Sequence, residues 1–393
     1  MRCGFAVDIG TTNIEISLWR LDDDSVPDEA SVCCSSNALS KTPLKTKSVR
    51  NCLCRYGADV VSRILYAHYH SVEELQNKLV AQLKTEFDTM LSEYSGAVVA
   101  RAVFTGNTVM LHFLSGFSVA GFEKAPFTPV SLFGDGGGAA CSPLASLADE
   151  VILPPCISAF LGADIVCAAL AAENAVSCDS ALKNDAPYIV IDIGTNTEIL
   201  LVGADGRKTG CSAAAGPAFE GGGLSVDMKG SALVAELARM LDESLMDETG
   251  YIAETTDGTG CGDNADERRT ILNQQDVRQL QLAKGATAAA AETLLSSVGL
   301  EAAGIKKCFI CGNFGNALDI NAVEKTGLLP AALAKNAVYF GNAALRGAEL
   351  ILLSSTAALQ QATQIAAETS VIQLADSAFF AEKYIQRMNF SAF

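Results

Sequence analysis

An internal repeat is the feature that most constrains how this chain of 393 residues can fold. Residues 5–18 align with residues 189–202, and Asp8 of the first copy falls on Asp192 of the second. Each copy reads as an apolar strand, a tight turn that contains a glycine, and a second strand of alternating apolar residues. The chain is therefore expected to contain the same strand-turn-strand unit twice.

A second pair of segments repeats later in each copy. Residues 98–114 and residues 305–320 both read as an apolar strand that enters a Gly-Asn turn and then a helix. Two matched pairs in the same order predict a duplicated α/β lobe with a cleft between the copies. Helices are also expected where leucine or alanine recurs at helical spacing. These segments are residues 72–94, with Ser71 as the N-cap, 279–297 and 343–367.

Composition supports a core-rich protein and argues against some partners. Hydrophobic residues make up 49% of the chain and charged residues 19%, and a length of 393 residues allows two or three domains. The net charge of −17 would repel a phosphate backbone, so we expect no nucleic-acid partner. Residues 102–122 lack charged side chains, but they include Asn107 and His112. We therefore expect a buried strand, turn and helix there and no membrane span.

The 13 cysteines are odd in number and scattered through apolar runs, which favours reduced thiols and a cytoplasmic location. No signal peptide is expected at the start of the chain. Cys33, Cys34, Cys52 and Cys54 are close in sequence, yet their spacing does not match a ferredoxin pattern. We expect no iron-sulfur cluster, and the role of these four cysteines stays open.

Three further side chains have a structural interpretation. Cys308 and Cys311 form a C-x-x-C pair, but residues three apart on a strand point to opposite faces, so buried thiols are expected there. His112 is expected to be a hydrogen-bonded core histidine; a corrinoid or metal ligand is the alternative.

The repeated Asp-Ile-Gly-Thr turn has the chemistry of a phosphate-binding loop. Its backbone N–H groups and hydroxyls can donate to a polyphosphate, and its aspartate can hold hydrated Mg²⁺. A single copy would be read equally well as an ordinary tight turn. Two copies, together with a Gly-Asn-Phe-Gly turn near residue 312, favour ATP bound with Mg²⁺. Asp8 and Asp192 are the candidate catalytic and Mg²⁺-orienting carboxylates, with Asp192 preferred for orienting water.

Three motifs resemble the phosphate-1, phosphate-2 and adenosine motifs of the actin, sugar-kinase and heat-shock-chaperone ATPases: VDIGTT at 7–12, IDIGTN at 191–196 and ICGNFGN at 310–316. Within that superfamily, the chain resembles the ATPase domain of the reductive activators of corrinoid proteins over nearly its whole length. The further motifs that carry this resemblance are RYGADVVSRI (55–64), TGNTVMLHFLSG (105–116), APFTP (125–129), LPPCISAFLGADIV (153–166), CSAAAGPAFEGG (211–222), LQLAKGA (280–286), GLLP (327–330) and GNAALRGA (341–348).

The resemblance implies duplicated ribonuclease H-like lobes of the actin-like ATPase fold around a nucleotide cleft. The expected lobes are residues 1–185 and 186–345, with a helical segment at 346–393 packing back on the first lobe. The residues expected to bind nucleotide are Asp8, Gly10, Thr11, Thr12, Asp192, Gly194, Thr195, Asn196, Gly312, Asn313 and Gly315.

The activity implied by the resemblance is the ATP-dependent reduction of Co(II) corrinoid to Co(I) on a methyl-transfer protein. Relatives usually carry an iron-sulfur module, which this sequence lacks, so a separate electron-donor protein is expected. The alternatives are a small-molecule kinase, a filament-forming actin-like protein and another ATPase of the actin-like superfamily with a different partner. The sequence does not fix the oligomeric state, and a homodimer is one of the states considered.

Five polar residues outside the turns are weaker candidates. Ser212 lies in a small-residue segment that we expect to be a loop, where a flat corrinoid could approach the backbone; packing beneath the cleft is the alternative. Glu198 and Glu220 could order metal-bound water or be solvated loop carboxylates. Gln281 and Lys284 could reach the ribose or adenine or form an exposed helix face.

Overall fold

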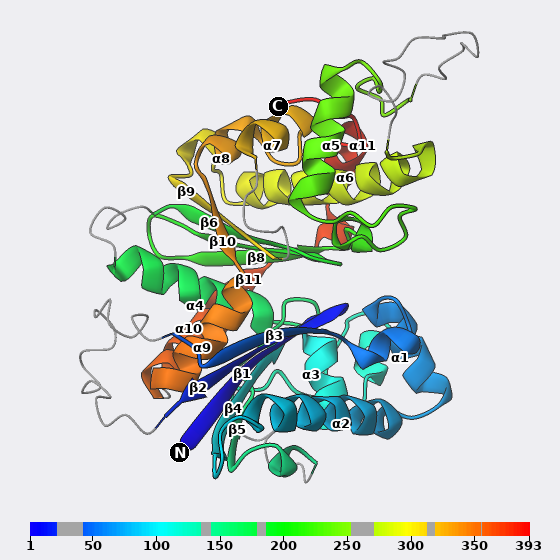
Figure 1. Cartoon of the computed structure of the whole chain (residues 1–393). Helices are drawn as coiled ribbons and strands as arrows, with labels where there is room; N and C mark the ends of the chain where they lie inside the picture. The colour runs from blue at the N-terminus through cyan, green and yellow to red at the C-terminus, as the bar shows by residue number, and fades with distance from the viewer. Residues whose placement is uncertain (22–41, 135–142, 179–185, 253–270, 313–318, 355) are drawn as a thin grey trace. The chain divides into compact units, whose positions relative to one another are not determined.

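The computed structural model describes the whole chain apart from residues 22–41, 135–142, 179–185, 253–270, 313–318 and 355 (Figure 1). The chain forms two compact units, each built from two stretches of sequence. The first unit is Met1–Asp185 with Asn342–Val371, and the second is Ala186–Gly341 with Ile372–Phe393.

A five-stranded sheet forms the centre of the first unit, in the order β3-β2-β1-β4-β5. Its strands are β1 (Arg2–Ile9), β2 (Asn13–Arg20), β3 (Lys45–Arg50), β4 (Val98–Gly106) and β5 (Glu150–Ile152). β2 is antiparallel to β1 and β3, whereas β4 is parallel to β1 and β5. The first two strands are the predicted hairpin, and Ile9 and Ile14 at its turn are fully buried.

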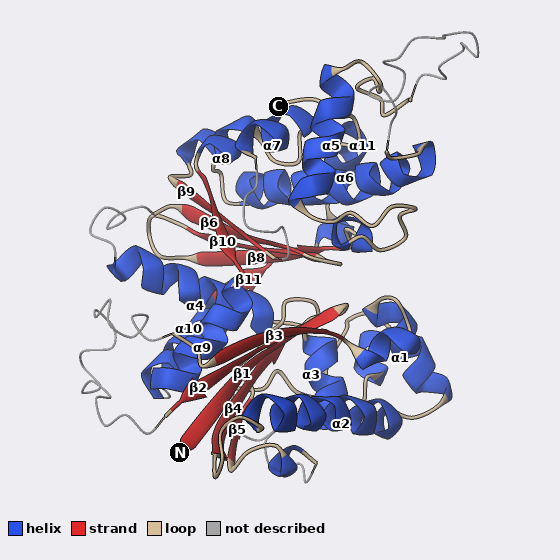
Figure 2. Cartoon of the chain, viewed as in Figure 1, coloured by secondary structure: helices blue, strands red, loops and turns tan. Residues whose placement is uncertain are grey.

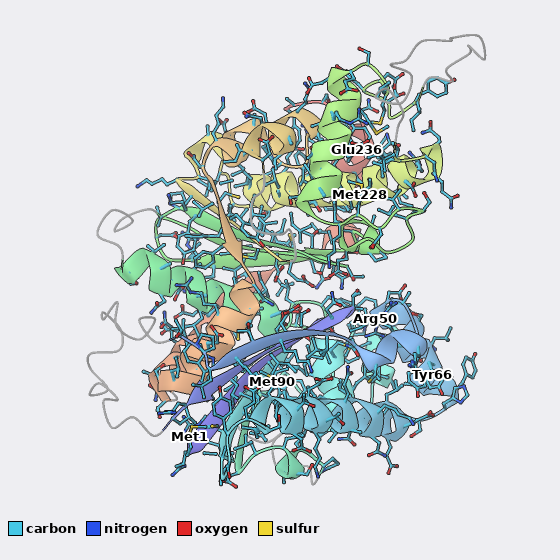
Figure 3. All side chains as sticks on the ribbon, viewed as in Figure 1. Met1, Arg50, Tyr66, Met90, Met228 and Glu236 are labelled. Carbon is cyan, nitrogen blue, oxygen red and sulfur yellow. The ribbon has the colours of Figure 1, made fainter. Side chains whose placement is uncertain are left out.

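Helices complete the first unit, packed on the sheet or on one another. They are α1 (Val60–Tyr69), α2 (Val72–Leu91), α3 (Thr108–Ser115), α4 (Ala163–Cys178), α9 (Ala343–Ser354) and α10 (Thr356–Glu368). α9 packs on α4 and against β1 and β4. Met90 of α2, labelled in Figure 3, joins the apolar core that α2 and α3 form with the sheet. Ser71 caps α2 as predicted, since its hydroxyl accepts a hydrogen bond from the Glu74 N–H.

The second unit repeats this plan, with neighbouring strands in the order β8-β7-β6-β9-β10 (Figure 2). These strands are β6 (Tyr188–Ile193), β7 (Thr197–Val202), β8 (Lys208–Ala213), β9 (Lys307–Cys311) and β10 (Ala337–Gly341). A further strand, β11 (Thr369–Val371), belongs to the end of the first unit. The helices are α5 (Ser231–Asp242), α6 (Gln274–Ser297), α7 (Ile320–Thr326), α8 (Ala331–Lys335) and α11 (Ala378–Gln386). Among the described helices, none is long and apolar enough to cross a membrane.

The duplication extends to pairing and backbone geometry. In both units an antiparallel three-strand meander is followed by two strands parallel to its first strand. Gly106 ends β4 with φ +151°, and a Cβ there would lie 2.8 Å from the Ile9 carbonyl oxygen. Gly312 follows β9 with φ +102°, and its Cβ would meet the carbonyl of the equivalent Ile193. Glycine at both positions therefore lets two neighbouring strands approach closely.

The end of the chain differs from the expected arrangement. Residues 342–371 belong to the first unit, but Ile372–Phe393 belongs to the second, where α11 packs on α6. The helix expected at 343–367 is two helices, α9 and α10. The Ser354 hydroxyl donates to the Leu350 carbonyl at 2.6 Å, a contact that competes with the helical backbone pattern near the end of α9.

Candidate functional site

In the second unit, strand register aligns three of the candidate residues in one row. Asp192 on β6 is opposite Glu198 on β7, which is opposite Ser212 on β8. Residues opposite each other on neighbouring strands share a face, and their neighbours Ile191, Ile193, Ile199 and Cys211 belong to the apolar core on the other face. The row therefore lies on the face of the sheet opposite that core.

Ser212 is part of strand β8, and the expectation that it lies in a loop is wrong. Cys211 and Ala213 on either side of it are buried in the core, so the strand alternation turns Ser212 to the other face. Small residues are typical of loops, but here Cys211, Ser212 and Ala213 belong to an alternating strand paired with β7. Ser212 is half-buried beside Glu198, which is 7% exposed.

The turn that follows Asp192 is held by its own backbone and by the next loop. Gly194 N–H donates to the Asn196 carbonyl at 2.9 Å, and Gly216 N–H donates to the Thr195 carbonyl at 2.8 Å. The Thr195 hydroxyl donates to a Glu220 carboxylate oxygen at 2.5 Å. Glu220 is thus positioned directly at this turn and is not a solvated loop carboxylate.

The Gly-Asn turn of the second unit begins beside Asp192. A Cβ on Gly312 would lie 3.0 Å from Asp192 Oδ1, so the glycine backbone adjoins that carboxylate. Cys311 pairs in register with Asp192. Asn313 and Gly315, the other expected adenosine contacts, lie outside the described residues.

The first unit carries an equivalent row. Asp8 on β1 is opposite Glu15 on β2, and Glu15 is opposite Ser48 on β3, whose hydroxyl donates to the Glu15 carboxylate at 2.6 Å. The Asn342 amide donates to Asp8 Oδ2 at 2.8 Å, while its own Oδ1 caps α9 by accepting from the Leu345 N–H. Each unit therefore presents an aspartate, a glutamate and a serine across three strands, and the sequence alignment revealed only the aspartates.

Gly10, Thr11 and Thr12 form the turn between β1 and β2, as predicted. A Cβ on Gly10 would lie 2.7 Å from the Asn13 carbonyl oxygen, so no larger side chain fits there without a shift. The Thr11 hydroxyl accepts from the Asn107 amide at 3.4 Å. This contact brings the Gly-Asn turn of the first unit against its phosphate-type turn.

Asp164, at the start of α4, is a carboxylate near this turn that the sequence analysis did not single out. A Cβ on Gly162 would lie 2.7 Å from Asp164 Oδ1 and 2.5 Å from the Asn107 Cα, so all three residues are adjacent. Burial raises the pKa of Asp164. The sequence signal for this residue is the Gly-Ala-Asp step at the start of the apolar helix 163–178.

His112 is the buried, hydrogen-bonded core histidine that was predicted. Its Nδ1 lies 2.7 Å from the Thr108 carbonyl, and its Nε2 accepts from the Ser131 N–H at 3.4 Å. This arrangement requires the proton on Nδ1 of a neutral ring, and burial lowers the pKa of His112 in agreement. Cys308 and Cys311 are fully buried free thiols, also as predicted.

Gln281 and Lys284 are not an exposed helix face, and neither side chain is directed at a ligand site. Both are buried in α6 and hold the C-terminal segment: Gln281 Nε2 donates to the carbonyls of Thr249 and Met388, at 2.7 and 3.2 Å. Lys284 Nζ donates to the carbonyls of Arg387, at 2.6 Å, and Asn389. Burial lowers the pKa of Lys284 to about 7.

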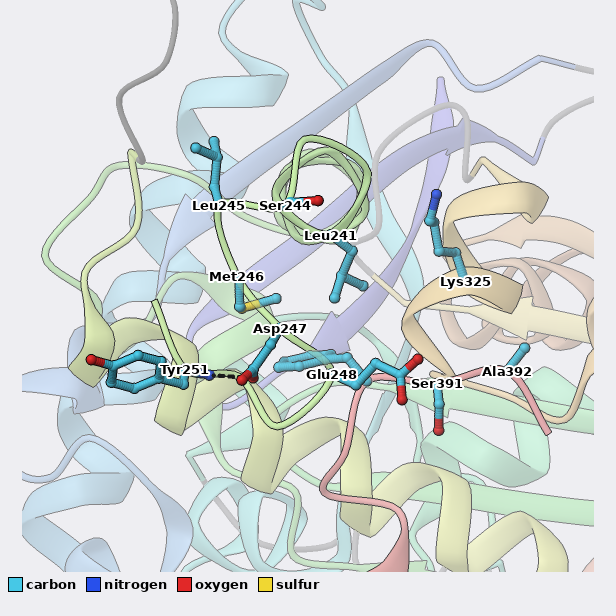
Figure 4. A pocket seen from close by; sticks show the side chains of 11 residues that line it. Leu241, Ser244, Leu245, Met246, Asp247, Glu248, Tyr251, Lys325, Ser391 and Ala392 are labelled. Carbon is cyan, nitrogen blue, oxygen red and sulfur yellow. Dashed lines mark hydrogen bonds between the residues drawn. The ribbon is translucent and has the colours of Figure 1, made fainter. Parts of the chain in front are cut away.

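A hollow of about 670 Å³ lies elsewhere in the second unit (Figure 4). Asp247, Glu248, Tyr251 and Lys325 contribute to its wall, together with C-terminal residues such as Ser391. The Asp247 carboxylate accepts from the Tyr251 N–H at 3.0 Å and is therefore engaged within its own loop. None of the predicted nucleotide-binding residues that the structure describes lines this hollow.

In the part of the chain that the structure describes, no group of three or more His, Cys, Asp or Glu side chains is placed to hold a metal ion. Cys52 and Cys54 are half-buried free thiols, and Cys33 and Cys34 lie outside the described residues.

Family models match both units. The model of the RACo middle region matches residues 3–175, and that of the C-terminal domain of RACo, the ASKHA domain, matches residues 186–256 and 227–392. The corrinoid activation enzyme RamQ of Eubacterium limosum is 26% identical over 448 residues, which cover 98% of this chain and 70% of RamQ. The [Co(II) methylated amine-specific corrinoid protein] reductase of Methanosarcina barkeri is 26% identical over 252 residues, covering 53% of this chain and 45% of that protein.

A solved structure shares the fold. The reductive activator for corrinoid,iron-sulfur protein superposes on this chain with a TM-score of 0.80 at 24% sequence identity. The match covers 100% of this chain and 66% of the chain of that activator. The chain thus spans about two thirds of that protein's length. The duplicated α/β lobes of the actin-like ATPase fold are confirmed by this likeness and by the ASKHA-domain match. With family models matching nearly its whole length, the chain belongs to the RACo family.

Proposed function

We propose that this protein is an ATP-hydrolysing activator that returns Co(II) corrinoid on a methyl-transfer protein to Co(I). The observation that carries the proposal is the pair of equivalent aspartate-turn rows, one in each unit of a RACo-family chain. The relatives named above are corrinoid activators or reductases, which supports this reaction over phosphorylation of a small molecule. The electron comes from a separate donor protein in this proposal.

In the proposed site, the backbone N–H groups and hydroxyls of both turns donate to the polyphosphate of ATP. Asp8 and Asp192 hold Mg²⁺ through water, and Mg²⁺ neutralises charge that develops on the phosphates. Asp192 also orients the attacking water. Gly312, Asn313 and Gly315 border the adenosine, and the half-buried Ser212 hydroxyl meets the corrinoid or its axial water.

Energetics are compatible with ATP as the driving force. A one-electron deficit of ~59 mV corresponds to ~1.4 kcal/mol. A ligand that moves a two-state equilibrium from 1:99 to 99:1 supplies about 5.5 kcal/mol, which offsets roughly 240 mV. Nucleotide-dependent coupling can therefore make a low-potential reduction accessible to an ordinary donor.

The proposal is tested by following Co(I) formation in the absorbance spectrum of a corrinoid protein. The reaction contains a chemical reductant too weak to reduce the corrinoid alone, with or without Mg-ATP and this protein. Co(I) should accumulate only when all components are present. Phosphorylation of a small alcohol or acid, with no effect on the corrinoid, would instead assign a kinase.

A further inference from the structure

Arg63 is a fully buried charged residue of the first unit, and the proposed function has given it no role. It lies on α1, the helix labelled at Tyr66 in Figure 3, and its side chain is 0% exposed. Burial of a guanidinium costs several kcal/mol unless its donors are satisfied. Its hydrogen-bond partners are carbonyl oxygens and sulfur atoms, with no carboxylate among them, which is an unusual setting for a buried cation.

The contacts of Arg63 converge on the turn between β1 and β2. Its Nη2 donates to the Thr11 carbonyl oxygen at 2.6 Å and lies 3.5 Å from Cys54 Sγ. Its Nε donates to the Gly57 carbonyl at 3.0 Å. A Cβ on Gly57 would lie 2.8 Å from Arg63 N and 3.0 Å from its Cγ, so the glycine provides room for the arginine stem.

Neighbouring residues hold the other carbonyls of the same turn. Asn51, which is 1% exposed, donates from Nδ2 to the Gly10 carbonyl at 2.8 Å and from its N–H to the Thr12 carbonyl at 2.9 Å. Cys54 Sγ lies 3.7 Å from the Thr11 carbonyl oxygen and 3.6 Å from that of Thr12. Three successive carbonyls of the turn therefore point at buried donors.

The orientation of these carbonyls fixes the orientation of the amides. In a trans peptide, the C=O of one residue and the N–H of the next point in opposite directions. Because the carbonyls of Gly10 and Thr11 point into the unit, the N–H groups of Thr11 and Thr12 point away from the buried donors. Through the Thr11 carbonyl, Arg63 also places a positive charge behind the Thr12 amide.

We propose that Arg63 is a positioning residue of the first phosphate turn: it holds the Thr11 carbonyl inward so that the Thr12 amide faces the β- and γ-phosphates of ATP. This inference rests on the proposed nucleotide site. Donors fixed in advance interact more strongly with a charged ligand than donors that must reorganise. The guanidinium fork reaches the carbonyls of Gly57 and Thr11 at once, which a lysine ammonium on a single stem cannot do.

The test compares Arg63→Lys and Arg63→Met with the matched control Arg55→Met, which alters an exposed arginine eight positions away in the same segment. Calorimetry measures the Kd of Mg-ATP and of AMP, which lacks the phosphates that this turn would contact. Loss of a charge-assisted contact predicts a Kd for Mg-ATP raised about tenfold or more in Arg63→Met, and raised less in Arg63→Lys. The Kd of AMP should change by less than about twofold, and Arg55→Met should match the parent.

The outcomes separate this inference from the proposed function. If the parent fails to bind Mg-ATP, both are contradicted. The inference is overturned if the parent binds Mg-ATP and the folded Arg63 variants bind it equally well. It is also overturned if the Kd values of AMP and Mg-ATP rise to the same extent in these variants. In either case Arg63 has a structural role alone. If Arg63→Met does not fold, the difference between the changes in Kd for Mg-ATP and for AMP in Arg63→Lys decides.

Discussion

The buried amine of Lys284 should make the stability of the second unit depend on pH. Its folded pKa is lowered from 10.5 to about 7 by burial, and its Nζ holds the Arg387 carbonyl at 2.6 Å. Between these two values the unfolded chain keeps the lysine proton while the folded chain has lost it. Since the unfolded state binds more protons, the free energy of unfolding rises with pH across this window. Below pH ~7 the contribution of Lys284 to the free energy of unfolding no longer changes with pH.

The size of the effect follows from the width of the window. Each pH unit well above the folded pKa adds ~1.4 kcal/mol, so from pH 7 to pH 9 the gain is about 2 kcal/mol. Lys284→Met keeps an unbranched buried side chain and removes the titrating group. The stability of the parent relative to this variant should therefore increase by about 2 kcal/mol over that interval.

Hydrogen exchange of peptides from α6 and α11, corrected for the intrinsic rate at each pH, measures this difference for the second unit alone. The buried cysteines also titrate on unfolding, but they contribute equally to parent and variant and cancel in the difference. Lys335→Met, at an exposed position of α8, is the matched control and should follow the parent. A difference between the parent and Lys284→Met that stays constant from about pH 7 to 9 would refute the reasoning.

Three further outcomes are expected. Asp192→Ala should lower ATP turnover by about a hundredfold or more while circular dichroism stays unchanged, and an unaltered rate would remove Asp192 from the site. Ser212→Val keeps the side-chain volume without the hydroxyl, so it should weaken Co(II) corrinoid binding or reduction and spare basal ATP hydrolysis; full activity would leave Ser212 a packing role. Iron and acid-labile sulfide analysis of anaerobically purified protein should find no stoichiometric cluster, and two or four irons per chain would overturn the interpretation of the cysteine spacings.

Much of the fold was predictable because it is duplicated. The strand-turn-strand copies predicted β1, β2, β6 and β7, and the segments before the Gly-Asn turns predicted β4 and β9. Local pattern was sufficient there, because alternation and glycine are properties of neighbouring residues. Helix α2 and its Ser71 cap were predictable for the same reason.

The sequence was insufficient where the environment of a residue depends on distant parts of the chain. Ser212 faces the row with Glu198 because β8 pairs with β7, and small residues alone do not reveal that pairing. Lys284 is buried because residues 387–389, a hundred positions later, supply its carbonyl acceptors. The burial of Arg63 depends on its contacts with Gly57 and Thr11, and the spacing of residues within α1 does not reveal those contacts.

ATP hydrolysis with and without a corrinoid protein tests the central claim most directly. The rate is measured for the protein alone, with the partner held in the Co(II) state, and with the partner held in the Co(I) state. An activator must distinguish substrate from product, because equal interaction with both redox states would bias neither. The account predicts that the Co(II) protein changes the rate of ATP hydrolysis and that the Co(I) protein changes it far less. A rate of ATP hydrolysis that is the same with either state as with the protein alone would contradict it.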